Sequence, residues 1–239
     1  MRTTILEQCG STNTEAKDHE KYSHGDALIA LQQTQGRGQR GHSWESAPGK
    51  NLTFSIVLEP GFLPAATQFI LSETVALAVA DTLSFYGLSP RIKWTNDIYV
   101  ADKKICGILL EHELKDGNVS RTVAGIGINV NQPAFPEWVP NPTSLFLETG
   151  IRHDIMEVFN VFGARFTDRY ATLENGGDDT ISREYNDILY RRDELHRYMI
   201  PGRGEVEGMV KQVENTGGLV MEIEGEQEKF LFREIEFII

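Results

Sequence analysis

The sequence predicts an α+β protein in which a mixed, largely antiparallel β-sheet is flanked by helices. Three observations support this fold class. Short apolar segments follow one another in hairpin order between residues 91 and 130. Two longer segments, residues 69–86 and 155–173, repeat apolar side chains at three- and four-residue steps, as amphipathic helices do. Near residue 198 the pattern changes to short strands and glycine turns, which indicates a small all-β barrel.

The individual elements follow from local patterns. The predicted strands before the barrel are residues 3–8, 27–32, 52–58, 91–94, 98–100, 104–114 and 119–130. The predicted helices are residues 15–22, 69–86, 155–173 and 181–192. Ser11, Thr12 and Asn13 are expected to cap the first helix, and Asp154 with Glu157 resembles a capping box. We therefore expect two domains, residues 1–197 and residues 198–239.

Composition and charge restrict the possible partners. The chain has 35 acidic and 23 basic side chains, a formal net charge of −12. A protein that binds nucleic-acid phosphates or an anionic membrane surface needs a basic face. The acidic net charge therefore disfavours both of these functions. No apolar run approaches the roughly 20 residues of a membrane span or forms the core of a signal peptide. Only Cys9 and Cys106 are available for disulfides. We expect a cytoplasmic protein whose partners are proteins or small molecules.

A glycine-rich basic loop, residues 36–41, matches the pattern G-x-G-x-x-G. A dinucleotide site is disfavoured because no helix opens behind these glycines, and a kinase loop because its downstream partner motifs are missing. The loop instead suits a phosphorylated intermediate, with Arg37 and Arg40 as anion-binding groups and Trp44 just beyond. A solvated surface turn explains the loop alone equally well.

Two further segments carry candidate chemistry. Lys93, Asn96 and Asp97 lie at a strand end, and Lys104 follows on the return strand of a hairpin, where it can meet the same anion as Lys93. The alternative is that these residues form a solvated hairpin tip without a functional role. The strand over residues 124–130 has glycine at alternate positions, so both glycines face one side of the sheet. This spacing favours either a slot for a flat apolar group or tight packing of a helix.

Taken together and in this order, five motifs resemble those of biotin protein ligases. They are residues 11–13, Gln33 with the loop 36–41, residues 93–97, residues 104–111 and residues 125–130. The resemblance implies a catalytic domain like that of class II aminoacyl-tRNA synthetases and biotin ligases, followed by an SH3-like barrel. It also implies a two-step reaction: biotin and MgATP form biotinyl-5′-adenylate, and a lysine of a biotin carrier domain then attacks the adenylate.

The resemblance further implies roles for individual residues. Lys104 bridges the carboxylate of biotin and the α-phosphate, Arg37 and Arg40 close over the intermediate, Lys93 lies near the phosphates, and Asp97 positions or deprotonates the acceptor lysine. The implied biotin-binding residues are Ser11, Thr12, Asn13, Gln33, Gly36, Arg37, Lys104, Gly107 and Gly125. The implied ATP- and adenylate-binding residues are Arg37, Arg40, Trp44, Lys93, Asn96 and Asn129. Neither metal ligands from the protein nor a permanently bound cofactor are expected.

Three other functions compete with biotin attachment. Lipoate or octanoate ligases and transferases resemble the same family, but the arginine loop and the segment at residues 93–97 favour biotin. A biotin-dependent repressor needs an N-terminal DNA-binding domain, for which the ten residues before Ser11 leave no room. A non-catalytic binder is disfavoured because Lys93, Asp97 and Lys104 are all present. The expected partner is a biotin carboxyl carrier protein or domain, and the sequence is compatible with a homodimer.

Overall fold

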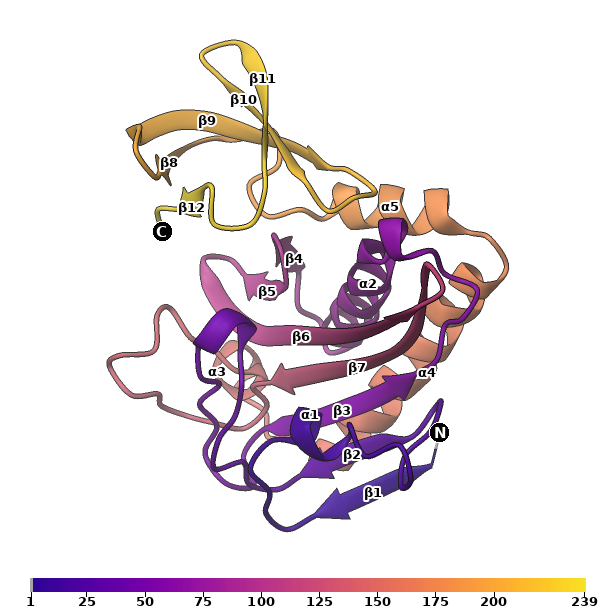
Figure 1. Cartoon of the computed structure of the whole chain (residues 1–239). Helices are drawn as coiled ribbons and strands as arrows, with labels where there is room; N and C mark the ends of the chain where they lie inside the picture. Colours follow the sequence, from indigo (N-terminus) through magenta and orange to yellow (C-terminus); the bar gives the residue numbers. More distant parts are fainter. Residues whose placement is uncertain (1) are drawn as a thin grey trace.

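The computed structural model describes residues 2–239, apart from the side chain of Arg40. A seven-stranded sheet forms its centre, in the order β1-β2-β3-β7-β6-β5-β4 (Figure 1). These strands are β1 (Thr3–Leu6), β2 (Ala27–Ala30), β3 (Leu52–Leu58), β4 (Pro90–Lys93), β5 (Asp97–Val100), β6 (Lys103–Lys115) and β7 (Asn118–Ile128). Only the β1/β2 pair is parallel. The prediction of a mixed, largely antiparallel sheet is therefore confirmed.

Two long helices cover one face of this sheet, while the short first helix and the glycine-rich loop lie over the other (Figure 1). The helices are α1 (Thr12–Glu15), α2 (Phe69–Phe85), α3 (Leu145–Thr149), α4 (Ile155–Glu174) and α5 (Asp178–Asp187). Short 3-10 turns occur at Gln39–Gly41 and Ala65–Thr67. Asp154 caps α4 as predicted, accepting hydrogen bonds from the backbone amides of Met156 and Glu157.

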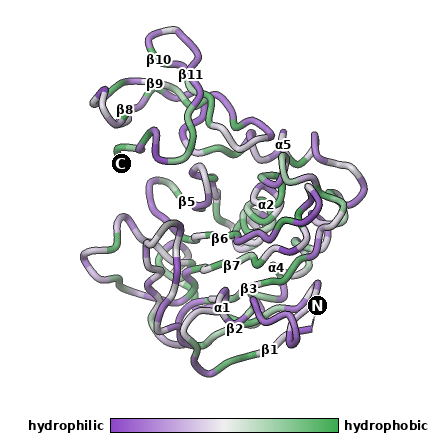
Figure 2. The backbone as a smooth tube through the Cα atoms, viewed as in Figure 1, coloured by the Kyte–Doolittle hydropathy of each residue, from purple (hydrophilic) through white to green (hydrophobic). Residues whose placement is uncertain are grey.

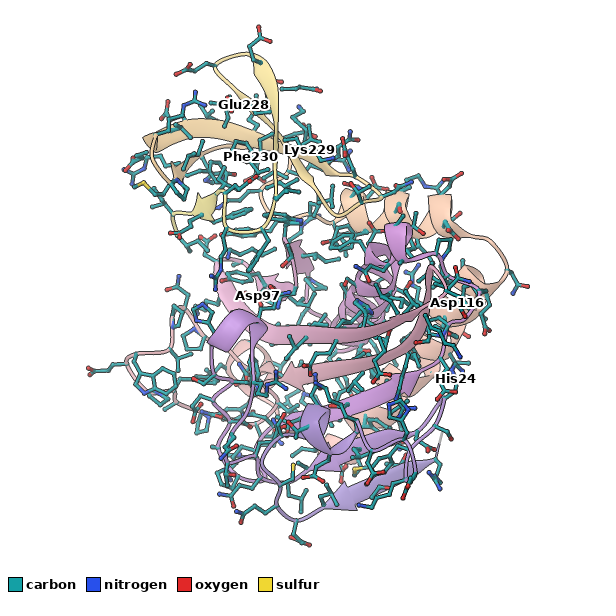
Figure 3. The ribbon with its side chains drawn as sticks, in the orientation of Figure 1. His24, Asp97, Asp116, Glu228, Lys229 and Phe230 are labelled. Carbon is teal, nitrogen blue, oxygen red and sulfur yellow. The ribbon has the colours of Figure 1, made fainter. Side chains whose placement is uncertain are left out.

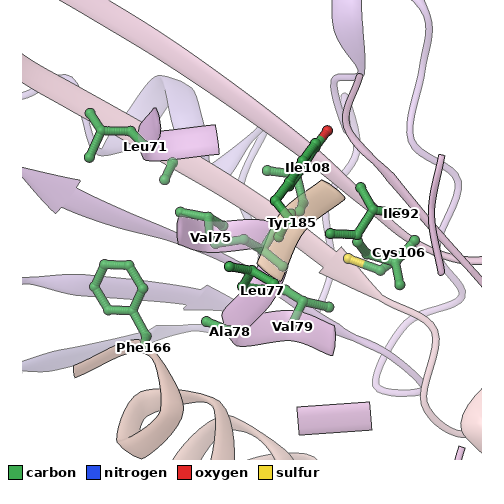
Figure 4. Close-up of a cluster of buried hydrophobic side chains, with 14 of the residues drawn as sticks. Leu71, Val75, Leu77, Ala78, Val79, Ile92, Cys106, Ile108, Phe166 and Tyr185 are labelled. Carbon is green, nitrogen blue, oxygen red and sulfur yellow. The ribbon is translucent and has the colours of Figure 1, made fainter. Parts of the chain in front are cut away.

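The main core lies between the sheet and the helical layer. Hydrophobic residues gather on the central strands and on α2, whereas the loops are mainly hydrophilic (Figure 2). The predicted aromatic side chains of α4 are buried, and Phe54 of β3 makes edge contacts with the rings of Phe159 and Phe162. Helix α2 is buried on most sides, because α4 and α5 pack on it from behind the sheet (Figure 4).

Two helix predictions need correction. The predicted helix over residues 15–22 is wrong, since α1 ends at Glu15 and turns follow it. The carboxylate of Asp18 accepts hydrogen bonds from the backbone amides of Glu20 and Lys21, which replace helical hydrogen bonds. The segment has no apolar stripe whose burial would favour the helix. The last predicted helix is shifted, because α5 begins at Asp178 and ends at Asp187. The chain beyond it joins the edge of β4, where the amide of Ile92 donates to the carbonyl of Ile188 over 2.8 Å.

The C-terminal strands form a second, antiparallel sheet in the order β11-β10-β9-β8-β12. They are β8 (Leu195–Ile200), β9 (Gly204–Val213), β10 (Leu219–Ile223), β11 (Glu226–Phe230) and β12 (Glu236–Phe237). The sheet begins before residue 198 and is open among the described residues, so the predicted closed barrel is not confirmed. Trp94 ties it to the main body by donating from Nε1 to the carbonyl of Gly217 over 2.9 Å. Within residues 2–239, no helix has both the length and the apolar character needed to cross a membrane.

Candidate functional site

One cavity of about 290 Å³ brings together most of the predicted site residues. It opens on the face of the sheet opposite α2 and α4, between α1, the glycine-rich loop and the β5–β6 hairpin. The predicted residues that line it are Ser11, Thr12, Asn13, Gln33, Arg37, Trp44, Lys93, Asn96, Asp97, Lys104, Gly107 and Gly125. Residues separated by more than one hundred positions in the chain therefore share one space.

A buried polar network forms one end of the cavity. The Oε1 atom of Gln33 accepts hydrogen bonds from the backbone amide of Thr12 over 2.8 Å and from its hydroxyl over 3.2 Å. Ser55, which is fully buried on β3, lies 2.8 Å from the Thr12 hydroxyl and 2.6 Å from Oδ1 of Asn13. Sequence reasoning missed Ser55, although a serine inside the apolar strand 52–58 is a signal that could have found it. Hydroxyl and amide groups at this end can both donate and accept.

The glycines of β6 and β7 make room for two side chains of the protein itself. A Cβ atom at Gly127 would lie 2.3 Å from Cε2 of Trp44, and one at Gly107 would lie 2.9 Å from Cζ3 of the same ring. A Cβ at Gly125 would lie 2.1 Å from Oδ1 of Asn13. The predicted slot therefore exists, but Trp44 and Asn13 occupy it in this structure. The alternative of helix packing holds at Gly125, because Asn13 belongs to α1, whereas Gly107 and Gly127 are covered by Trp44 of the segment after the glycine-rich loop.

A lysine and a carboxylate meet at the centre of the cavity. The Nζ atom of Lys104 lies 2.7 Å from Oδ1 of Asp97, and 27% and 17% of the respective side chains are exposed. Asp97 begins β5, below the C-terminal strands in Figure 3. The amide of Lys104 donates to the carbonyl of Asn141, which anchors its backbone. Its Nζ also lies 5.7 Å from the centre of the Trp44 ring. A cation held this way can bind an incoming anion without large rearrangement.

Lys93 supplies a second cation to the cavity, from the end of β4. Its Nζ atom lies near two aromatic rings, 5.4 Å from the centre of Tyr99 and 5.0 Å from that of Phe237. Burial lowers the pKa of Lys93 below its ordinary value, although the neighbouring Asp97 carboxylate opposes that shift. The structure therefore places Lys93, Asp97 and Lys104 together, as the sequence predicted.

The glycine-rich loop places Arg37 against the carboxylate of Glu111, which was not among the predicted site residues. Arg37 lies 3.2 Å from Glu111 of β6, which also pairs with Lys17 over 2.8 Å. Burial opposes ionisation of Glu111, but hydrogen bonds from Lys17 and Asn13 hold its pKa below the ordinary value. In this structure Glu111 competes for Arg37 with any other anion that binds in the cavity.

Gly36 does not line the main cavity, and its role is in loop folding. A Cβ atom there would lie 2.4 Å from the carbonyl oxygen of Trp44, whose amide donates to Gly36 over 2.9 Å. The side chain of Arg40, predicted to bind the intermediate, lies outside the described residues. The sequence thus identified the loop, while its closure depends on a contact between the loop's two ends.

Two predicted asparagines have mainly structural partners. The side chain of Asn96 lines the cavity, and its Nδ2 donates to the carbonyl of Ile108 over 2.6 Å. Asn129 does not line the cavity, because its Nδ2 donates to the carbonyl of Thr143 over 2.9 Å. It holds the segment that follows β7.

Several cavity residues were missed by sequence reasoning. The missed lining residues are Gln39, His42, Ser43, Phe54, Trp94, Ile108, Leu109, Ile126 and Phe232. Phe232 comes from the turn between β11 and β12, so the C-terminal sheet also contributes to the site. No local pattern connects that residue to a cavity built by the first half of the chain. Across residues 2–239, no group of three or more His, Cys, Asp and Glu side chains is placed to hold a metal ion.

Comparisons with known proteins agree with this arrangement. Residues 5–129 match the model of the biotin/lipoate A/B protein ligase family. The chain is 32% identical to a biotin–[acetyl-CoA-carboxylase] ligase of Paracoccus denitrificans, covering 91% of this chain and 92% of that protein. It is 32% identical to the bifunctional ligase/repressor BirA of Escherichia coli, covering 92% of this chain and 69% of that protein. A biotin protein ligase from Aquifex aeolicus, solved with biotin and ATP, superimposes with a TM-score of 0.82, 27% identity and coverage of 99% and 98% of the two chains.

Proposed function

This chain belongs to the biotin/lipoate A/B protein ligase family, and we propose that it uses ATP to attach biotin to a lysine of a carrier domain. The observation that carries the proposal is the single cavity in which the Lys104–Asp97 pair meets the polar network around Thr12 and Gln33. One end offers neutral donors and acceptors, and the other offers cations. Biotin has the same division, since a neutral ureido ring and a carboxylate lie at its two ends.

In the proposed complex, the ureido ring occupies the end lined by Ser11, Thr12 and Gln33. Ser55 lies behind this wall and holds Thr12 and Asn13 in place. The hydroxyl groups and the Gln33 amide can match its donors and acceptors. The apolar tail then extends along the sheet past Gly107, where the missing side chain allows close approach. Trp44 must shift from its position over Gly127 or form one wall of the tail's path. This places the carboxylate of biotin beside Lys104.

The first proposed step is adenylation. A carboxylate oxygen of biotin forms a bond to the α-phosphorus of ATP, and the bond from that phosphorus to the departing pyrophosphate breaks. Both reactants are anionic, so cations at the meeting point lower the barrier by offsetting their repulsion. Lys104, Lys93 and Arg37 all line the cavity, and the phosphates compete with Glu111 for the Arg37 guanidinium group. Magnesium enters as part of the ATP substrate, bound to its phosphates.

The second proposed step is transfer to the carrier. The neutral amine of the acceptor lysine attacks the carbonyl carbon of the adenylate, AMP leaves, and the amine loses a proton as the amide forms. Asp97 lies at the centre of the cavity and can accept that proton or orient the amine once the adenylate has engaged Lys104. Closure of the glycine-rich loop with Trp44 keeps water from hydrolysing the intermediate.

The carrier is a biotin carboxyl carrier protein or domain of a biotin-dependent carboxylase, and the reaction takes place in the cytoplasm without binding to DNA. The net charge of −12 supports the last point, because DNA binding needs a basic face. In this proposal the C-terminal sheet corresponds to the SH3-like domain of the family.

The decisive test incubates the purified chain with MgATP, a carrier domain and either biotin, lipoate or octanoate. We expect pyrophosphate release with biotin and a biotin-sized mass increase on one carrier lysine. Turnover with lipoate or octanoate alone would establish the alternative acyl ligase instead. Lys104→Ala should lower adenylate formation by about two orders of magnitude or more without unfolding the protein, because it removes a charge at the reacting centre. A folded Lys104→Ala variant with unchanged pyrophosphate release would contradict the assignment of Lys104.

A further inference from the structure

The last strand of the chain reaches the candidate site through one aromatic ring. Phe237 lies on β12, which pairs with β8 at the edge of the C-terminal sheet. Its ring centre lies 5.0 Å from Nζ of Lys93, on β4 of the other sheet. The two residues are separated by more than one hundred positions and belong to different sheets, so their contact exists only when the sheets are docked.

The surroundings of Phe237 hold its ring in place. Tyr198 packs edge-on against it with 5.1 Å between ring centres, and Tyr190 lies on another side at 6.2 Å. Tyr99 contacts Tyr190 and lies 5.4 Å from the Lys93 ammonium group. An aromatic cluster therefore forms around one lysine, with Phe237 as the member contributed by the end of the chain.

The rings restrict where the Lys93 ammonium group can lie. A flexible lysine has four rotatable bonds, and a cation over an aromatic face is attracted by the electron density of the ring. With Tyr99 and Phe237 near it, Lys93 points to the cavity rather than into solvent. A second hollow beside the main cavity shares Lys93 and Phe232 with it and is bounded by Phe237.

We propose that Phe237 is a positioning residue: its ring holds the Lys93 ammonium group at the cavity, so that ATP is used efficiently only when the C-terminal sheet is docked. The inference rests on the proposed function, because it gives Lys93 a nucleotide phosphate as its ligand. Phe237 itself touches no substrate in this account. The proposed biotin end of the cavity, lined by Ser11, Thr12 and Gln33, does not depend on it.

The test compares Phe237→Leu with Phe237→Tyr in the full-length chain. Leucine keeps an apolar side chain without the ring, whereas tyrosine keeps the ring. For Phe237→Leu we expect kcat/KM for ATP to fall about tenfold, in line with a desolvated cation–aromatic contact, while the Kd for biotin measured without ATP stays the same. Phe237→Tyr should keep most of the wild-type kcat/KM for ATP. An unchanged kcat/KM in folded Phe237→Leu would overturn the proposal.

A matched control separates the ring contact from general weakening of the sheet. Phe230 is a buried phenylalanine on β11 of the same sheet, so Phe230→Leu removes a ring elsewhere. At equal loss of thermal stability, Phe230→Leu should leave kcat/KM for ATP near the wild-type value. An equal loss of kcat/KM in both variants would refute a specific role for Phe237. If Phe237→Leu does not fold, Phe237→Met provides the same comparison.

A second measurement does not depend on the activity. In lysine-labelled protein, the ring current of Phe237 should displace the proton resonances of the Lys93 ε-methylene group. Those resonances, assigned with Lys93→Arg, should move toward ordinary lysine positions in Phe237→Leu and stay displaced in Phe237→Tyr. If they do not move, the contact is refuted whatever the enzyme does. If they move but biotin supports no pyrophosphate release in the wild type, the proposed function falls and the positioning of Lys93 stands.

Discussion

A buried carboxylate on α2 makes the stability of this protein depend on pH. Glu73 is fully buried, and one of its carboxylate oxygens accepts a hydrogen bond from the hydroxyl of Ser182 on α5 over 2.7 Å. Its other oxygen has no hydrogen-bond partner among the described residues. Burial raises the pKa of Glu73 to about 7; the Ser182 hydrogen bond opposes this shift, and the charge of Asp178 adds to it. The protonated form is therefore the one that the folded state favours.

The direction and size of the effect follow from linkage. The folded-state pKa lies above the ordinary value of 4.5, so the unfolded chain releases this proton at a lower pH than the folded chain. The contribution of Glu73 to stability is complete below about pH 4.5 and is lost as the pH rises through about 7. At about 1.4 kcal/mol per pH unit, that interval corresponds to a loss of about 3 kcal/mol.

Glu73→Gln tests this reasoning because glutamine keeps the shape and the hydrogen-bonding oxygen but does not ionise. We expect urea unfolding at pH 8 to show the variant to be more stable than the wild type by about 3 kcal/mol, with the advantage shrinking toward pH 5. Glu226→Gln, at an exposed position, serves as the control and should leave the wild-type pH dependence in place. Parallel stability profiles for Glu73→Gln and the wild type from pH 5 to 8 would refute the explanation.

Two substitutions test the cavity itself. Gly127→Ala should displace the Trp44 indole, because the new Cβ would lie 2.3 Å from Cε2 of that ring. Tryptophan emission should then shift, and hydrolysis of the intermediate should rise. Gly163→Ala on α4, with open space around it, should change neither. Emission identical to wild type in Gly127→Ala would show that the indole does not need this glycine. Ser55→Ala removes the hydroxyl group that lies between Thr12 and Asn13. Calorimetry should show biotin binding weakened by about 1–3 kcal/mol. An unchanged Kd for biotin would contradict this expectation.

Local patterns in the sequence were sufficient for much of the fold and for the identity of most cavity residues. Short apolar segments separated by turn residues predicted the seven strands of the main sheet. The glycines at 125 and 127 and the lysines at 93 and 104 were recognised because their spacing within strands places them on defined faces or ends. The order of five short motifs then indicated the family, which the comparisons confirm.

Only the tertiary structure decided what these residues touch. The sequence shows room above Gly127, but packing puts Trp44 there, and it pairs Arg37 with Glu111 of another element. The helix predicted over residues 15–22 is absent, because local hydrogen bonds compete with a helix that lacks an apolar stripe.

The contribution of the C-terminal sheet was equally invisible in the sequence. Phe232 enters the cavity and Phe237 reaches Lys93 from more than one hundred residues away. Periodicity and propensity describe neighbours along the chain, whereas such contacts depend on how two sheets dock. For this protein the sequence by itself determined the strands, the cations and the family, and the docking of the two sheets decided which of those cations the end of the chain holds in place.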